Sequence, residues 1–161
     1  MAKTYVGIDP GKHGFIAVLR GDGGTEFLSI EDSGEREVSE FLRALAATEC
    51  YAVIEDVHAV FGASAKSTFE FGYCKGWLVG LLTAHGIAFS MVAPKSWQQG
   101  VWERCDKVTK EGRVRPKETS VRCAARIFPN VDLRRNERCK TVSEDKCDAL
   151  LMAEYGRRNN L

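Results

Sequence analysis

The chain has 161 residues, of which 44% are hydrophobic and 28% charged, and its formal net charge is +1. This composition excludes intrinsic disorder as a general description, and we expect residues 1–161 to fold as a single domain. The apolar stretches fall well short of the roughly 20 residues that a membrane span needs, so no membrane association is expected.

The start of the chain and its cysteines favour a cytoplasmic protein. Met1 to Thr4 run directly into a strand-like segment instead of an apolar signal core. The six cysteines contain no Cys-x-x-Cys pair, and the three histidines do not stand at zinc-finger spacing from any cysteine pair. We therefore expect reduced thiols and no zinc site.

The small net charge hides an asymmetry along the chain. Residues 1–60 carry 5 basic and 11 acidic side chains, whereas residues 61–161 carry 18 basic and 11 acidic ones. The span from Arg104 to Arg126 alone holds 8 basic and 3 acidic residues. A polyanion could dock on this span, although charge alone is equally compatible with a solvated basic surface.

The first third of the chain predicts three strands, a helix and a fourth strand. Apolar runs separated by glycine-rich turns indicate an antiparallel meander. Apolar residues at helical spacing follow, and then a second short apolar run. The expected strands are Tyr5–Ile8, Phe15–Leu19, Thr25–Ile30 and Tyr51–Glu55, and the expected helix is Glu37–Ala47.

The rest of the chain predicts helices around one more strand. The expected elements are a helix over Ala63–His85, a strand over Ile87–Val92, a loop or short helix from Pro94, a helix from Pro116 that ends before Pro129, and a helix from near Ser143. The order β-β-β-α-β-α-β-α predicts an α/β fold with a mixed five-stranded sheet and helices on both faces.

The glycines of the long helix and the polar span that follows Val101 each predict a further structural feature. Gly72, Gly76 and Gly80 recur every fourth residue in the long helix, although each glycine costs about 1 kcal/mol relative to alanine. Close packing on the sheet would explain them, and a subunit interface is the alternative. The span from Val101 to Pro116 has few apolar residues and is expected to be a mobile loop.

Carboxylates end two of the predicted strands. Asp9 follows Val6-Gly7-Ile8, and Glu55 follows the apolar run Tyr51–Ile54. A single strand-end carboxylate is often only a turn former. If the two strands are neighbours, however, both charges lie at one edge of the sheet and repel each other unless a cation lies between them.

The last predicted helix supplies two more acids. Ser143 can cap its N-terminus, which also explains Glu144 and Asp145 in the first turn. Capping does not explain Asp148, which lies on the same helix face as Asp145. Four carboxylates favour Mg²⁺ or Mn²⁺ over zinc and can hold two ions about 4 Å apart, an arrangement suited to phosphodiester hydrolysis. With the basic second half of the chain, this predicts a metal-dependent nuclease.

Four motifs follow one another along the chain: Val6-Gly7-Ile8-Asp9-Pro10-Gly11, Ala52-Val53-Ile54-Glu55-Asp56-Val57, Ala93-Pro94-Lys95-Ser96-Trp97 and Asp145-Lys146-Cys147-Asp148-Ala149-Leu150-Leu151. In this order they resemble the motifs of RuvC-like Holliday junction resolvases, and the resemblance runs over nearly the whole chain. The phage and organelle branches of that group are the most similar, on the basis of three features: Pro94-Lys95-Ser96-Trp97, a helix that ends in Ile127-Phe128-Pro129, and the run Ala149-Leu150-Leu151-Met152-Ala153-Glu154-Tyr155-Gly156.

The resemblance implies an RNase H-like fold, a homodimer, and paired symmetrical nicking of four-way DNA junctions with Mg²⁺ or Mn²⁺. Asp9, Glu55, Asp145 and Asp148 match the family's acidic residues. His58 stands where relatives often carry an aromatic wedge, with Phe61 nearby, which leaves open which of them enters the junction. The expected phosphate contacts are Lys95, Lys107, Lys110, Arg113, Arg115 and Lys117. The resemblance fits a bacterial or phage-infected cell, or an organelle.

Other classes of protein share parts of this pattern. Ile8-Asp9-Pro10-Gly11 also resembles the first phosphate-binding turn of actin-like sugar kinases and ATPases, which need two lobes and more than twice this length. A nuclease of the same fold could act on flaps, other branched DNA or RNA. A DNA-binding relative without catalysis is a third alternative, and the four retained carboxylates argue against it.

Overall fold

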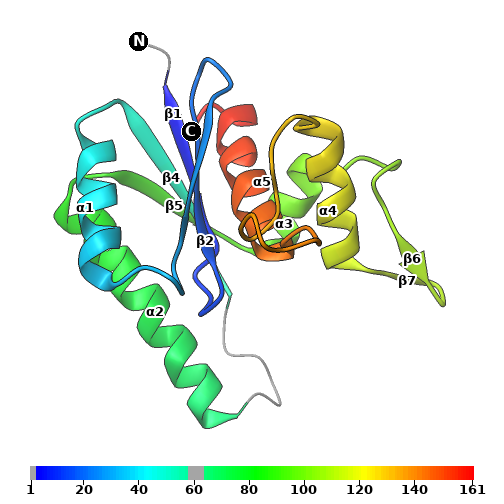
Figure 1. Ribbon diagram of the computed structural model, residues 1–161, viewed down its shortest axis with the longest axis horizontal. Helices are drawn as coiled ribbons and strands as arrows, with labels where there is room; N and C mark the ends of the chain where they lie inside the picture. Colours follow the sequence, from blue (N-terminus) through cyan, green and yellow to red (C-terminus); the bar gives the residue numbers. More distant parts are fainter. Residues whose placement is uncertain (1–2, 58–63) are drawn as a thin grey trace.

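The computed structural model describes residues 3–57 and 64–161, and it contains a five-stranded sheet flanked by helices (Figure 1). The strands of the sheet are β1 (Thr4–Ile8), β2 (Phe15–Leu19), β3 (Thr25–Ser29), β4 (Cys50–Glu55) and β5 (Ala88–Val92). The helices are α1 (Glu35–Ala46), α2 (Ala65–Ala84), α3 (Pro94–Val101), α4 (Pro116–Ile127) and α5 (Glu144–Arg158).

The sheet is mixed, with the strand order β3-β2-β1-β4-β5. The first three strands form the predicted antiparallel meander, joined by the short segments 9–14 and 20–24. After helix α1 the chain returns parallel to β1, and after α2 it adds β5 parallel to β4. The β1 and β4 strands therefore lie side by side at the centre and end at the same edge of the sheet. The expected five-stranded mixed sheet and its element order are confirmed.

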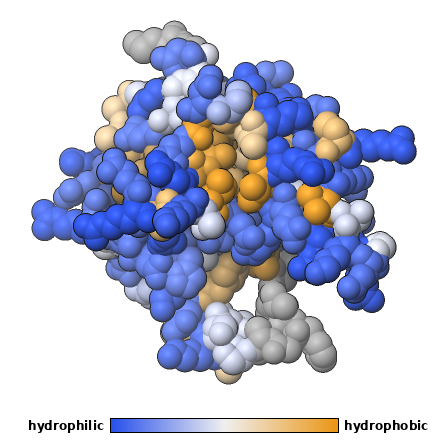
Figure 2. Space-filling view, turned by 45° about the vertical axis from the view of Figure 1, so that its right-hand side comes forward, coloured by the Kyte–Doolittle hydropathy of each residue, from blue (hydrophilic) through white to orange (hydrophobic). Residues whose placement is uncertain are grey.

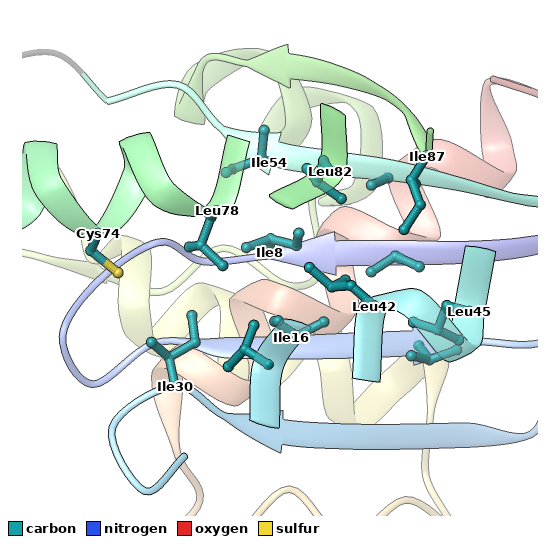
Figure 3. Close-up of a cluster of buried hydrophobic side chains, with 14 residues drawn as sticks. Ile8, Ile16, Ile30, Leu42, Leu45, Ile54, Cys74, Leu78, Leu82 and Ile87 are labelled. Atoms are coloured by element: carbon teal, nitrogen blue, oxygen red, sulfur yellow. The ribbon is translucent and has the colours of Figure 1, made fainter. Parts of the chain in front are cut away.

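Helices cover both faces of the sheet, as the alternation of side chains along the strands requires. Ile8 and Ile16 point toward α1 and α2, where they pack with residues such as Leu42, Leu78 and Leu82 (Figure 3). The next side chains along the strands, such as Val53, point to the opposite face and pack against α3, α4 and α5. The central strands are apolar on both faces because they are buried between these two layers.

Helix α5 approaches the sheet closely at Gly7 of β1. A Cβ atom at this position would lie 1.9 Å from the Ala149 carbonyl oxygen and 2.5 Å from the Ala153 nitrogen. Only glycine leaves room for the backbone of α5 here. This contact fixes the distance of the helix from β1, and therefore the height of α5 above the end of that strand.

The span from Val101 to Pro116 differs from the predicted loop. It contains a two-stranded hairpin of β6 (Thr109–Lys110) and β7 (Arg113–Val114). Glu111 and Gly112 both have positive φ angles, 52° and 73°, which is the backbone conformation of the tight turns that join antiparallel strands. Each strand of this hairpin has two residues, and both strands are exposed. The hairpin therefore buries no apolar face, and the sequence shows no apolar alternation that would have predicted it.

The three spaced glycines of α2 also differ from the expectation. A Cβ atom at Gly72, Gly76 or Gly80 would meet nothing within 4 Å, so this face does not pack closely on the sheet. Leu78 and Leu82, on another side of the helix, make the contact with the core instead. Phe69 and Tyr73 of α2 are exposed.

In residues 3–57 and 64–161, none of the helices has the length and apolar character that crossing a membrane requires.

Candidate active site

The strand ends bring Asp9 and Glu55 together. The parallel register pairs Ile8 of β1 with Ile54 of β4, so the next residues, Asp9 and Glu55, emerge side by side at the edge of the sheet. Side chains alternate along a strand, and Gly7 and Val53 face α5. Asp9 and Glu55 therefore emerge on the α5 side as well.

Helix α5 brings the other two predicted acids to this edge. Ser143 caps the helix, since its side chain accepts a hydrogen bond from the Lys146 N–H, as expected from the sequence. Asp145 and Asp148 stand three residues apart, and Ala149, which touches Gly7, follows at once. The helix face that contacts β1 is therefore the face that carries the two carboxylates.

The charges of these four side chains act on one another. Burial raises the pKa of Asp9 well above its usual range, and the negative charges of Glu55, Asp148 and Asp145 raise it further. The backbone N–H of Gly11 opposes the increase by donating to the Asp9 carboxylate. Asp9 is thus the centre of a cluster in which ionised carboxylates repel each other across a poorly solvated space. The four predicted carboxylates therefore lie close enough for their charges to interact, and their role as metal ligands stays a prediction.

Asp148 has the least favourable surroundings for a charge. Burial, followed by the charges of Glu55 and Asp145, raises its pKa to about 7, against a favourable interaction with the Ser120 hydroxyl. Its Oδ1 atom is buried and has no hydrogen-bond partner in the described parts of the chain. Buried carboxylate oxygens are normally satisfied, and a missing partner points to an absent ligand.

Trp97 holds Glu55 in place, a role that the sequence did not reveal. This tryptophan of α3 is fully buried, and its Nε1 donates a 2.8 Å hydrogen bond to Glu55 Oε1. Burial raises the pKa of Glu55, while the bond from Trp97 and the nearby Lys75 lower it. Lys75 itself pairs with Asp56, the residue after Glu55. The Pro-Lys-Ser-Trp motif contains this tryptophan, but nothing in one sequence says which side chain a buried indole reaches.

The predicted phosphate-contacting residues lie on one side of this acidic edge. Lys117, in the first turn of α4, reaches the acidic cluster itself, with its Nζ 3.1 Å from Glu144 and 3.5 Å from Asp145. The other five basic residues extend away from the cluster along α3 and the β6–β7 hairpin, and all are exposed: Lys95, Lys107, Lys110, Arg113 and Arg115. Two further predicted contacts, His58 and Phe61, lie outside the described residues.

The acidic cluster suits a divalent cation chemically, although the described residues do not form a finished site. No group of three or more His, Cys, Asp or Glu side chains in residues 3–57 and 64–161 stands as a ready metal-binding set. The donors are all carboxylates, the type of ligand that Mg²⁺ and Mn²⁺ prefer. The unpaired Oδ1 of Asp148 and the mutual repulsion around Asp9 are both relieved by a positive ion. The residues therefore fit such an ion.

Comparison of the sequence with protein families and with curated proteins finds no match. Comparison of the structure with solved structures does find similar folds. The structure of Thermus thermophilus RuvC in complex with a Holliday junction substrate has a TM-score of 0.57 at 11% identity, over 98% of this chain and 94% of that one. A second structure of Thermus thermophilus RuvC has a TM-score of 0.54 at 16% identity, over 98% and 96%.

The chain has a RuvC-like fold. The RNase H-like α/β architecture expected from the sequence is thereby confirmed, and it extends over nearly the whole chain. At these identities the likeness concerns the fold, so the resemblance to the phage and organelle branches remains a prediction.

Proposed function

We propose that the protein is a divalent-metal-dependent endonuclease that resolves four-way DNA junctions. The observation that carries the proposal is the acidic cluster of Asp9, Glu55, Asp145 and Asp148, brought to one sheet edge by three separate elements of a RuvC-like fold. The likeness to the solved RuvC complex with a Holliday junction supports a four-way DNA junction as the class of substrate. A cytoplasmic or organellar location is part of the same proposal.

The four carboxylates would hold Mg²⁺, or Mn²⁺ in its place, and two ions per site are expected. Such ions lower the pKa of an attacking water and stabilise the leaving oxygen during phosphodiester hydrolysis. The protein would contribute by holding these carboxylates in place. Asp9 and Asp148 are buried and lie near other negative charges, so binding a cation would stabilise their ionised form, which water solvates poorly here. Trp97 fixes the orientation of Glu55 through its hydrogen bond.

The basic side chains next to the cluster would hold the DNA backbone. Residues 107–115 carry 4 basic side chains and 1 acidic one, all on or beside the exposed hairpin. Lys117 lies between this hairpin and the acidic cluster and would contact a phosphate close to the cut. Charged residues of this type set affinity and its salt dependence more than sequence choice.

A homodimer is part of the proposal, because one acidic cluster cuts one strand while resolution needs two symmetrical cuts. A two-fold dimer would match the symmetry of the junction. The open glycine face of α2 supports a contact there, since Gly72, Gly76 and Gly80 have free space above them and Phe69 is 74% exposed on the same helix.

A cleavage assay with Mg²⁺ on a labelled four-way junction tests the proposal. Duplex, flap, and DNA–RNA hybrid substrates of the same sequence are the comparison. We expect paired nicks in opposite strands of the junction and at least about tenfold slower cutting of the other substrates. Faster cutting of flaps or hybrids would instead identify a nuclease of the same fold with another substrate.

Sedimentation and plasmid cleavage test the dimer. At micromolar concentration the protein should sediment at about twice 17.9 kDa. A supercoiled cruciform plasmid should give linear product with little nicked circle. A monomer that releases singly nicked circles would contradict the paired mechanism.

A further inference from the structure

A cleft lies between helix α3 and the base of the β6–β7 hairpin. Its cavity volume is about 420 Å³, within the range of sites that hold small organic groups. We call it the α3 cleft. Its lining residues are Lys95, Gln98, Gln99, Trp102, Lys107, Val114 and Pro116.

The chemistry of the α3 cleft is divided between apolar and hydrogen-bonding groups. Trp102, Val114 and Pro116 supply apolar surface, and Val114 is 42% exposed although it is a large aliphatic residue. Within residues 3–57 and 64–161, neither the two lysines nor the two glutamines of the cleft use their side chains in a hydrogen bond or ion pair. Unpaired donors and acceptors around an apolar surface are typical of a ligand site.

The hairpin base that forms one wall of the cleft is held firmly. Asp106 is buried and accepts two 2.8 Å hydrogen bonds from Arg126 of α4. Thr119 Oγ1 accepts from the Val108 N–H and donates to the Arg115 carbonyl oxygen, which ties both ends of the hairpin to α4. The cleft is therefore part of the folded structure, not a gap under a loose loop.

The α3 cleft also continues toward the acidic cluster. A second, smaller cleft shares Val114 and Pro116 with it, and extends past Lys117 to Glu144. Glu144 is followed by Asp145, one of the four carboxylates. Figure 2 shows that this side of the molecule is mainly hydrophilic, with an apolar patch near the centre of the view. The two clefts are therefore neighbours, and the smaller one reaches the first turn of α5 beside the acidic cluster.

We propose that the α3 cleft binds one unstacked nucleobase of a DNA strand whose backbone lies on the basic hairpin. The inference rests on the proposed function for its substrate, DNA. The lysines at the cleft would contact the phosphates that flank the base. The base itself would lie against the apolar wall, and the amides of Gln98 and Gln99 would bond to its edge.

A base explains the lining better than a phosphate does. Phosphate recognition needs positive charge and N–H donors, and it has no use for the apolar surfaces of Val114 and Pro116. Glutamine amides carry a donor and an acceptor, which matches the edge of a base, and aromatic side chains bind the faces of bases. A four-way junction whose arms are held apart by the protein would offer such a base at its branch point. This site would give the enzyme a preference for the nucleotide near the cut.

Short single-stranded oligonucleotides test the proposal on the whole chain without divalent metal, so that no cleavage occurs. The probes are a pentadeoxynucleotide and the same backbone with abasic residues. We expect the protein to bind the probe with bases at least about fivefold more tightly, the lower end of what stacking of one base contributes. The double variant Gln98→Ala and Gln99→Ala should lose most of this difference, while Asn130→Ala, an exposed amide elsewhere on the surface, should keep it.

The outcomes separate this inference from the proposed function. Equal binding of the two probes by the wild type, or an unchanged difference in the double variant, would overturn the base site even if four-way junctions are cut. A preference that depends on the glutamines would support the site even if junctions are not cut. On junctions that are cut, the double variant should spread its cleavage over more sequences at an unchanged salt dependence of binding.

Discussion

The acidic edge of the sheet and the basic hairpin present charge in opposite ways. Asp9 and Asp148 lie at the end of a packed core, where burial and like charges raise their pKa values. Lys107, Lys110 and Arg113 project into solvent from a hairpin without a core of its own. The buried charges of the acidic edge therefore lower the stability of the fold, whereas the exposed charges of the hairpin hardly affect it.

The difference follows from what each region has to do in the proposed reaction. Carboxylates that bind cations must be fixed within a small space, so they are mounted on β1, β4 and α5 and supported by contacts such as Trp97 to Glu55. Side chains that bind a polyanion act through charge over several ångströms and need exposure more than precision. Stability is therefore sacrificed at one region and not at the other.

Removing one acid should produce the largest effect. We expect Asp9→Asn or Asp148→Asn to reduce junction cleavage at least about a hundredfold with Mg²⁺, with junction binding preserved, because an amide is a weak metal ligand. The exposed carboxylate of Glu26 on β3 provides the control, and Glu26→Gln should cleave normally. Wild-type rates in either variant would remove that residue from the site.

The same substitution tests whether the acidic edge opposes folding. Burial raises the pKa of Asp148 from 3.8 to about 7, so the folded state binds its proton more tightly than the unfolded state does. Without metal, ionised Asp148 therefore destabilises the fold progressively as the pH rises from about 4 to about 7. Urea unfolding at pH 8 should show Asp148→Asn to be at least as stable as the wild type, and added Mg²⁺ should stabilise only the wild type. A less stable variant would contradict this account of the acidic edge.

Removing the basic side chains of the hairpin should weaken DNA binding without affecting the fold. Replacement of Lys107, Lys110, Arg113 and Arg115 by alanine should lower affinity by about tenfold or more at low salt. It should also reduce the logarithmic salt slope by up to about 0.9 for each phosphate that is no longer neutralised. Thermal unfolding should be nearly unchanged, because these side chains are exposed. An unchanged slope in a salt titration would place the DNA path elsewhere.

The folding stability contributed by the base of the hairpin should also depend on pH, but there the ionised carboxylate of Asp106 stabilises the fold, whereas ionised Asp148 destabilises it. Hydrogen bonds from Arg126 hold the pKa of the buried Asp106 at about 2, against 3.8 normally. This difference corresponds to roughly 2 kcal/mol of stability that is fully present above about pH 4 and is lost as the pH falls toward 2. We expect Asp106→Asn to lose about that amount at pH 7 and much less at pH 2.5. The exposed Asp132, paired with Arg134, is the control, and its asparagine variant should change stability little.

The smallest effect is expected at the open face of α2. Because a Cβ atom at Gly76 meets nothing within 4 Å, Gly76→Ala should raise the free energy of unfolding of the monomer by up to about 1 kcal/mol. The matched change under the acidic edge, Gly7→Ala, should instead be strongly destabilising, since its Cβ would overlap the Ala149 carbonyl. Chemical unfolding at low protein concentration measures both. A destabilised Gly76→Ala monomer would show that this face is packed within the chain.

The sequence predicted the sheet, the long helices and the four carboxylates because these depend on local patterns. Apolar runs indicate buried strands, Ser143 before an acidic turn indicates a helix start, and acids at strand ends remain at strand ends in the fold. The expected bounds of β1 to β5 differ from the observed ones by no more than one residue. Such features need no knowledge of what packs against them.

Only the tertiary structure decided which partners these residues have. The regular spacing of the glycines in α2 suggested close packing on the sheet, but nothing lies within 4 Å of a Cβ atom placed on them. The glycine that a helix backbone does contact is Gly7, because the position of α5 over β1 depends on the packing of the whole core. The hairpin of Thr109 to Val114 had no apolar period to reveal it, since it is held by polar contacts to Thr119. The bond from Trp97 to Glu55 joins residues 42 positions apart, and such distant contacts follow from chain topology instead of local pattern.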